Sequence, residues 1–167
     1  YLNILNLSST NSLQYFNVAG NQLTTMSLNS LRYHTGLTEL YAGGNPAQTI
    51  DLAFLSDLTN LEVLSFEDGS LESIDLTGLD GNTNFKELRL ASNNLTSISL
   101  WPLGDCDNIE VIDLSMNSLP TVNLSPIWNL NELTQIYLQD NDLTEIELNP
   151  LASCEAIAVL NLSSNML

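Results

Sequence analysis

The stretch FKELRLASNNLTSISLWPL at residues 85–103 determines the fold, because its apolar positions recur along the whole chain. Leu88, Leu90 and Leu95 surround a central Asn93, and this spacing returns every 24 residues without an insertion or a deletion. The successive units open at Leu13, Leu37, Leu61, Phe85, Ile109, Leu133 and Ile157. A fixed period of this length is typical of repeat proteins, in which each unit buries its apolar side chains against its neighbours.

Each unit begins with a segment in which apolar and polar residues alternate, as around Leu88 and Leu90. Alternation predicts a short strand, and we expect successive strands to pair in parallel along one side of the stack. A second alternating stretch, such as residues 95–100, is expected to return along the other side. Ser125-Pro126 and Asn149-Pro150 then predict N-caps of short 3₁₀ segments, because Ser and Asn favour the N-cap and Pro the position after it.

The chain is expected to turn at an asparagine that follows each strand. An asparagine side chain both donates and accepts hydrogen bonds, so stacked asparagines can satisfy backbone groups inside the bend. Gly69 replaces the asparagine in one unit, where we expect a local weak point or an ordered water. The predicted asparagine ladder consists of Asn21, Asn45, Asn93, Asn117, Asn141 and Asn165.

The pattern L-x-x-L-x-L-x-x-N-x-L resembles the leucine-rich repeat family over the whole chain, and its I-x-L-x-P-L stretch is similar to microbial surface members. The resemblance implies an α/β solenoid, a right-handed curved superhelix of about seven repeats. A parallel β-sheet would line its concave face, with short turns or 3₁₀ segments on the convex face. We expect residues 1–167 to form a single solenoid segment that is uncapped at both ends and belongs to a longer protein.

The charge balance is strongly acidic, with 3 Lys and Arg residues against 20 Asp and Glu residues and a formal net charge of -17. Such a surface repels the phosphates of nucleic acids and anionic lipids, and it favours cationic partners or simply solubility. We therefore expect no nucleic-acid partner. No apolar run is long enough to span a bilayer, so we also expect no membrane insertion.

Cys106 and Cys154 occupy the same position in units that are 48 residues apart. Strands stack about 4.8 Å apart, so the two thiols are expected roughly 10 Å apart, beyond the reach of a disulfide. We predict two free, buried thiols that act as small apolar fillers. His34, the one histidine, occupies the same position and is predicted to be a partly buried spacer.

The sequence holds no credible catalytic set, and we predict that the chain is not an enzyme. His34 has no second histidine beside it in the sequence, and no zinc-ligand spacing occurs. Asp51 and Asp75 are expected to point outward from neighbouring returning strands, about 4.8 Å apart. They are candidates for binding calcium, which prefers several oxygen ligands, and the alternative is that both carboxylates are merely solvated. No other cofactor is expected.

The variable row of outward residues on the strands is the predicted binding surface. Tyrosines in this row offer a large contact area with a polar tip. The alternative is that the row is only a solvated sheet face. The residues predicted to contact a partner are Tyr15, Asn17, Glu39, Tyr41, Glu67, Glu87, Arg89, Asp113, Gln135 and Tyr137.

The resemblance and this row together predict a non-enzymatic module for protein–protein or surface recognition, on a secreted or cell-surface protein. Its partner would be a protein or surface ligand bound on the concave sheet face, and the acidic surface favours a cationic one. The alternative function is a structural element, such as a stalk, sheath or filament, that self-associates end to end through exposed terminal repeats.

Overall fold

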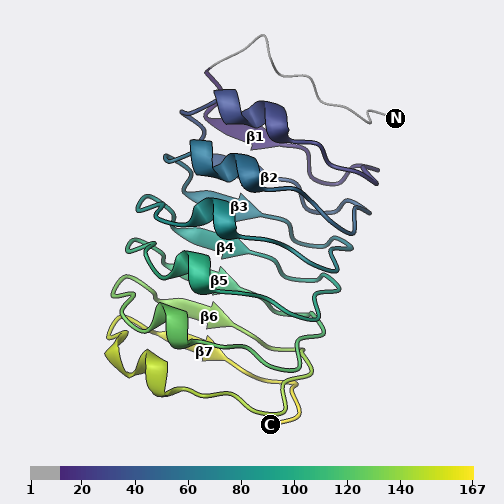
Figure 1. Ribbon diagram of the computed structural model, residues 1–167. Helices are drawn as coiled ribbons and strands as arrows, with labels where there is room; N and C mark the ends of the chain where they lie inside the picture. Colours follow the sequence, from purple (N-terminus) through teal and green to yellow (C-terminus); the bar gives the residue numbers. More distant parts are fainter. Residues whose placement is uncertain (1–11) are drawn as a thin grey trace.

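The computed structural model describes residues 12–167 as a single stack of coils (Figure 1). Each coil contributes one three-residue strand to a seven-stranded sheet, in which the strands follow one another in chain order. All six strand pairs are parallel, and each strand residue pairs with the residue 24 positions later, as Phe16 does with Leu40. The strands are β1 (Tyr15–Asn17), β2 (Glu39–Tyr41), β3 (Val63–Ser65), β4 (Glu87–Arg89), β5 (Val111–Asp113), β6 (Gln135–Tyr137) and β7 (Val159–Asn161).

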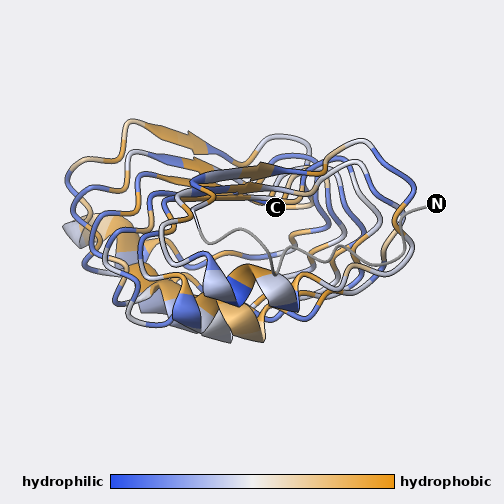
Figure 2. Ribbon diagram, turned by 90° about the horizontal axis from the view of Figure 1, so that it is seen from above, coloured by the Kyte–Doolittle hydropathy of each residue, from blue (hydrophilic) through white to orange (hydrophobic). Residues whose placement is uncertain are grey.

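Six short 3₁₀ helices form the opposite side of the stack, across the interior from the sheet (Figure 2). The predicted solenoid is therefore confirmed as one open, curved, parallel sheet with short 3₁₀ segments on its other side. No helix within residues 12–167 has the length and apolar character needed to cross a membrane. The 3₁₀ helices are η1 (Asn29–Tyr33), η2 (Ala53–Asp57), η3 (Thr77–Leu79), η4 (Trp101–Leu103), η5 (Ser125–Ile127) and η6 (Asn149–Ser153).

The core runs continuously between the sheet and the 3₁₀ helices. The middle residue of each inner strand is buried, for example Leu64 and Leu88, and so is a residue of the facing 3₁₀ helix, for example Leu79 and Leu103. Because equivalent positions are filled in every unit, the side chains of one coil pack directly on those of the next. The outward residues of the strands are consequently held on a rigid support.

The returning segments differ from the prediction, because they are not strands. Their only bridge within the described residues joins Met26 to Ile50. The predicted N-caps are also wrong, since Ser125 and Asn149 are the first residues of η5 and η6, and leucines occupy the N-cap positions. Side chains two residues upstream accept the first helical N–H instead, and these are Asp51, Asp75, Asn123 and Glu147.

The asparagines after the strands link adjacent coils. The Asn117 side-chain Nδ2 donates to the carbonyl oxygens of Leu114 and Ser115 in its own coil and of Leu90 in the preceding coil. Its Oδ1 accepts the backbone N–H of Leu95 at 3.0 Å. Equivalent bonds to a neighbouring coil are made by Asn45, Asn93, Asn141 and Asn165. These bonds satisfy backbone groups that the bend would otherwise leave unpaired in the interior.

The residue before the turn asparagine, or before Gly69 in the coil that lacks one, adopts a left-handed conformation in every described coil, which the sequence pattern did not predict. Met116 has φ of 55° there, although methionine has no side-chain group that favours this region.

We expect Met116→Gly to raise the free energy of unfolding by about 1 kcal/mol, because glycine adopts positive φ without strain. Urea denaturation measures this gain, and Met166→Gly, at a position without positive φ, should give none. An unchanged or lower stability of Met116→Gly would contradict the strain.

His34 is fully buried, so the expectation of a partly buried spacer is wrong. Neither ring nitrogen has a hydrogen-bond partner within the described part of the chain. Leu58 and Leu130 fill the same position in other coils and are equally buried.

We expect His34→Leu to stabilise the fold by about 1–2 kcal/mol, because it removes buried polar atoms that lack partners. Thermal unfolding tests this, and a lower melting temperature would show that the ring makes an interaction that leucine cannot replace.

The prediction of two free, buried thiols is confirmed for Cys106 and Cys154. Burial raises the pKa of the Cys106 thiol to about 12 and also raises the pKa of Cys154. At pH 8 the thiolate of Cys106 is therefore present in only about one molecule in ten thousand.

We expect a thiol-specific disulfide reagent to leave the native protein unmodified on the timescale of minutes and to label both cysteines in urea. Rapid labelling of the native chain would contradict this burial.

Candidate functional site

The outward face of the sheet, called the concave face below, carries the predicted binding residues. Nine of the ten are the first or third residue of a strand, because alternate strand residues point to the same side. The tenth, Glu67, lies two residues beyond β3. The middle residues of the same strands point into the core. The structure therefore places the ten residues on one face, nine of them on β1, β2, β4, β5 and β6 and Glu67 just beyond β3.

The side-chain hydrogen bonds of the predicted binding residues join residues of the same coil. Tyr41 donates its hydroxyl hydrogen to Glu39 Oε2 at 2.9 Å, and Tyr137 donates to Gln135 Oε1 at 2.8 Å. Arg89 forms an ion pair with Glu87 in which Nη2 and Oε2 are 2.8 Å apart. Ser115 Oγ donates to Asp113 Oδ1 at 2.6 Å. These pairs hold the outward side chains in fixed positions, which lowers the entropy lost when a partner binds.

Two of the three predicted tyrosines lie together at the N-terminal end of the sheet. The rings of Tyr15 and Tyr41 have centroids 5.5 Å apart and are tilted by 40°. Burial and the nearby Glu39 carboxylate raise the pKa of Tyr41 to about 12, so its hydroxyl stays protonated at neutral pH. Tyr137 belongs to β6 and is separated from this pair by three strands.

A hollow of about 330 Å³ opens on the concave face beside Tyr41. It exists because Ala19, Gly43 and Gly44 have little or no side chain, whereas the residues around them are larger. The carboxylate-bearing residues that line it are Glu67 and Asp68. Ser65 Oγ donates to Glu67 Oε2 at 3.1 Å, which orients that carboxylate. The predicted binding residues Asn17, Tyr41 and Glu67 line this hollow, and Ser65 and Asp68 line it as well.

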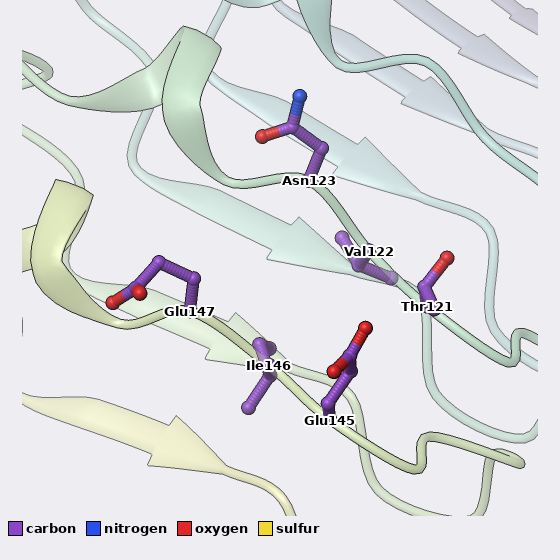
Figure 3. A pocket seen from close by; sticks show the side chains of 6 residues that line it. All are labelled: Thr121, Val122, Asn123, Glu145, Ile146 and Glu147. Atoms are coloured by element: carbon purple, nitrogen blue, oxygen red, sulfur yellow. The ribbon is translucent and has the colours of Figure 1, made fainter.

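A second hollow, of about 430 Å³, lies between two returning segments (Figure 3). Thr121 and Asn123 come from one segment and Glu145 and Glu147 from the next, with apolar residues between them. Asn123 and Glu147 occupy the same repeat position as the predicted calcium candidates. Their side chains accept backbone N–H groups of the following 3₁₀ helices at 2.9 and 3.0 Å.

The two calcium candidates make the same kind of capping bond. Asp51 Oδ1 accepts the N–H of Ala53 at 3.0 Å, and Asp75 Oδ1 accepts that of Thr77 at 2.9 Å. The bonds from Thr77 lower the pKa of Asp75. In the part of the chain that the structure describes, no three His, Cys, Asp or Glu side chains gather as metal ligands. Calcium binding at Asp51 and Asp75 stays a prediction, and capping of η2 and η3 accounts for both carboxylates.

The family model for the leucine rich repeat matches residues 83–143. No curated protein sequence matches the chain. A Leptospira interrogans LRR protein has a similar structure, with a TM-score of 0.79 and 21% identity over 91% of this chain and 37% of that one. The plant peptide hormone receptor RGFR1, solved in complex with RGF2, gives a TM-score of 0.81 and 23% identity over 95% of this chain and 26% of that one.

A third similar structure is that of TLR13 in complex with ssRNA13. Its TM-score is 0.74 at 25% identity, over 91% of this chain and 21% of that one. The chain therefore spans well under half the length of each of these three proteins. Proteins of this architecture commonly recognise other proteins or ligands. Residues 83–143 match the leucine rich repeat family, and the seven stacked strands of the chain form the same kind of leucine-rich repeat solenoid as these structures.

Proposed function

We propose that the chain is a non-enzymatic recognition module that binds an extended segment of a protein partner on its concave face. The observation that carries the proposal is the hollow beside Tyr41 and Glu67, set within a row of outward side chains that already hold one another in place. A preformed hollow next to oriented polar groups is the usual character of a binding site. The structure of RGFR1 with the peptide RGF2 supports this reading, because that receptor shares the fold.

The chemistry of the row indicates what the segment would carry. The Tyr15 and Tyr41 rings offer apolar area, while Glu67 and Asp68 beside the hollow favour a basic side chain of the partner. The formal net charge of -17 would attract such a segment from a distance. The remaining predicted residues, from Glu87 to Tyr137, would contact the rest of the segment. A place on a secreted or cell-surface protein is part of the same proposal.

Selection of displayed decapeptides against the folded chain, followed by calorimetric titration of the enriched sequences, tests this function. We expect enriched peptides to contain Arg or Lys, and we expect Tyr41→Ala and Glu67→Gln each to weaken their binding about tenfold. Tyr33→Ala is the matched control, because Tyr33 is an exposed aromatic residue of η1 on the other side of the stack. A failure to enrich any peptide, or binding that survives both concave substitutions, would contradict the proposal.

A further inference from the structure

Two tryptophans are exposed on the side of the 3₁₀ helices, away from the concave face. Trp101 begins η4 and is 69% exposed, and Trp128 follows η5 and is 57% exposed. They are the only tryptophans in the sequence. Tryptophan is usually well buried in folded proteins, so large exposed aromatic side chains indicate contact with something else.

The repeat does not require an aromatic residue at either position. The residue equivalent to Trp101 is Thr77 in the preceding coil and Ser125 in the following one. The residue equivalent to Trp128 is Gly104 in the preceding coil and Ala152 in the following one. Small or polar side chains are thus sufficient for folding at both positions. The neighbouring coils fold without an indole at either position.

The tryptophans stand around two adjoining hollows. One hollow, of about 420 Å³, lies between Trp101 and Trp128, and Asp105 and Asn129 also line it. The other, of about 360 Å³, is lined by Trp101, Asp80 and Asp105. Asp105 borders both hollows. The two coils approach closely here, since a Cβ on Gly104 would lie 3.0 Å from the carbonyl oxygen of Pro126.

No basic side chain of the chain itself neutralises these carboxylates. Within residues 12–167, ion pairs join Arg32 to Asp57, Lys86 to Glu62 and Arg89 to Glu87, and the sequence has no other Lys or Arg. Asp80 and Asp105 therefore face the hollows beside indole rings without a cation from this chain. The face of an indole attracts cations, most strongly of all aromatic side chains, and a nearby carboxylate adds to that attraction.

We propose that Trp101, Trp128, Asp80, Asp105 and Asn129, called the tryptophan site, bind an arginine or lysine side chain of a protein partner. The cation would lie against an indole face in the hollow between the tryptophans, with Asp105 as its counter-ion. Asn129 can accept a further hydrogen bond from a guanidinium group. This surface is on the opposite side of the coil from the concave face, so it would be a second contact region and does not depend on the function proposed above.

Intrinsic fluorescence reports on this site directly, because both tryptophans of the chain belong to it. The probe is an acetylated and amidated Arg-Arg-Arg tripeptide, titrated into the whole chain at low salt. We expect a saturable change in tryptophan emission. The neutral citrulline tripeptide, which has nearly the same shape, should give no saturable change. An equal response to both tripeptides would overturn the proposal, because it would show that charge is not recognised.

Substitutions then locate the binding. We expect Asp105→Asn and Trp128→Ala each to weaken binding about tenfold, as followed by the remaining tryptophan fluorescence and by calorimetry. Circular dichroism should be unchanged, because both side chains are exposed. Tyr33→Ala is the control for a general aromatic contact, and Tyr41→Ala separates this site from the concave face. Wild-type affinity of Asp105→Asn and Trp128→Ala, loss only in Tyr41→Ala, or a fluorescence response to a neutral oligosaccharide without one to the arginine peptide would each overturn the proposal.

Discussion

Asn93→Ala is expected to lower the free energy of unfolding by about 3 kcal/mol or more. The Asn93 Nδ2 group lies within 2.7 Å of the Phe66 carbonyl oxygen and also donates to Leu90 and Ala91, while Oδ1 accepts the N–H of Leu71 at 3.0 Å. Alanine would leave the Phe66 carbonyl oxygen and the Leu71 N–H in the interior without a partner, because the Leu90 and Ala91 oxygens still accept from Asn117 Nδ2 and from the Asp68 N–H, and each unpaired group costs about 1–3 kcal/mol. Equilibrium urea denaturation measures the loss.

The neighbouring residue supplies the control for this experiment. Asn94 is exposed, whereas Asn93 is buried, so Asn94→Ala makes the same chemical change without removing the bonds between coils. We expect Asn94→Ala to change stability by less than about 0.5 kcal/mol, as surface substitutions usually do. Equal effects of the two substitutions would mean that the ladder does not stabilise the stack.

Gly43→Ala is expected to be destabilising by about 3 kcal/mol, or to prevent folding of the N-terminal coils. A Cβ on Gly43 would lie 2.1 Å from the backbone oxygen of Glu67 and 2.8 Å from its backbone nitrogen. Because the opposing atoms belong to the backbone, relief requires β2 and β3 to separate, which disturbs the hydrogen bond from Gly44 N to Glu67 O at 2.7 Å. The same shift would alter the hollow beside Tyr41.

Gly36→Ala is the matched control, since a Cβ there would have no atom within 4 Å and the residue has no positive φ. We expect it to be neutral or slightly stabilising, because alanine restricts the unfolded chain. Thermal unfolding of the two variants followed by circular dichroism distinguishes them. A Gly43→Ala protein as stable as Gly36→Ala would show that the coils are not in close contact at this point.

The fold could be predicted from the sequence because the repeat supplies the same signal many times. Any single coil, such as that of Leu88 and Leu90, contains too few apolar positions to settle a fold. Seven coils in one register leave only a stack in which equivalent residues meet, and the pairing of Phe16 with Leu40 and of Leu88 with Ile112 is the result. The outward residues could be predicted for the same reason, because strand alternation places them on the opposite side from these core residues.

Local backbone geometry could not be read in this way. Asp51 and Asp75 looked like outward residues of a strand, but the following 3₁₀ helix needs an acceptor for its first N–H, and their side chains take that role. Met116 shows the same limit, since its left-handed backbone is imposed by the turn and not by its own preference. In both cases the conformation of the coil as a whole overrides the tendency of the residue.

The binding surface was predicted only in part. Tyr41 and Glu67 were identified as members of the row, but the hollow beside them forms only where the small residues Ala19, Gly43 and Gly44 of two coils come together in the stack. Trp101 and Trp128 were missed as a pair because they occupy different positions in their coils. Only the folded stack brings them to the same hollow.

Amide chemical-shift mapping with the tightest selected peptide tests the central claim, recognition by the concave face, most directly. We predict that the shifts fall on the outward residues of β1 to β6 and are largest around the hollow at Tyr41 and Glu67. Shifts confined to the 3₁₀ side, or scattered evenly along the stack, would contradict it.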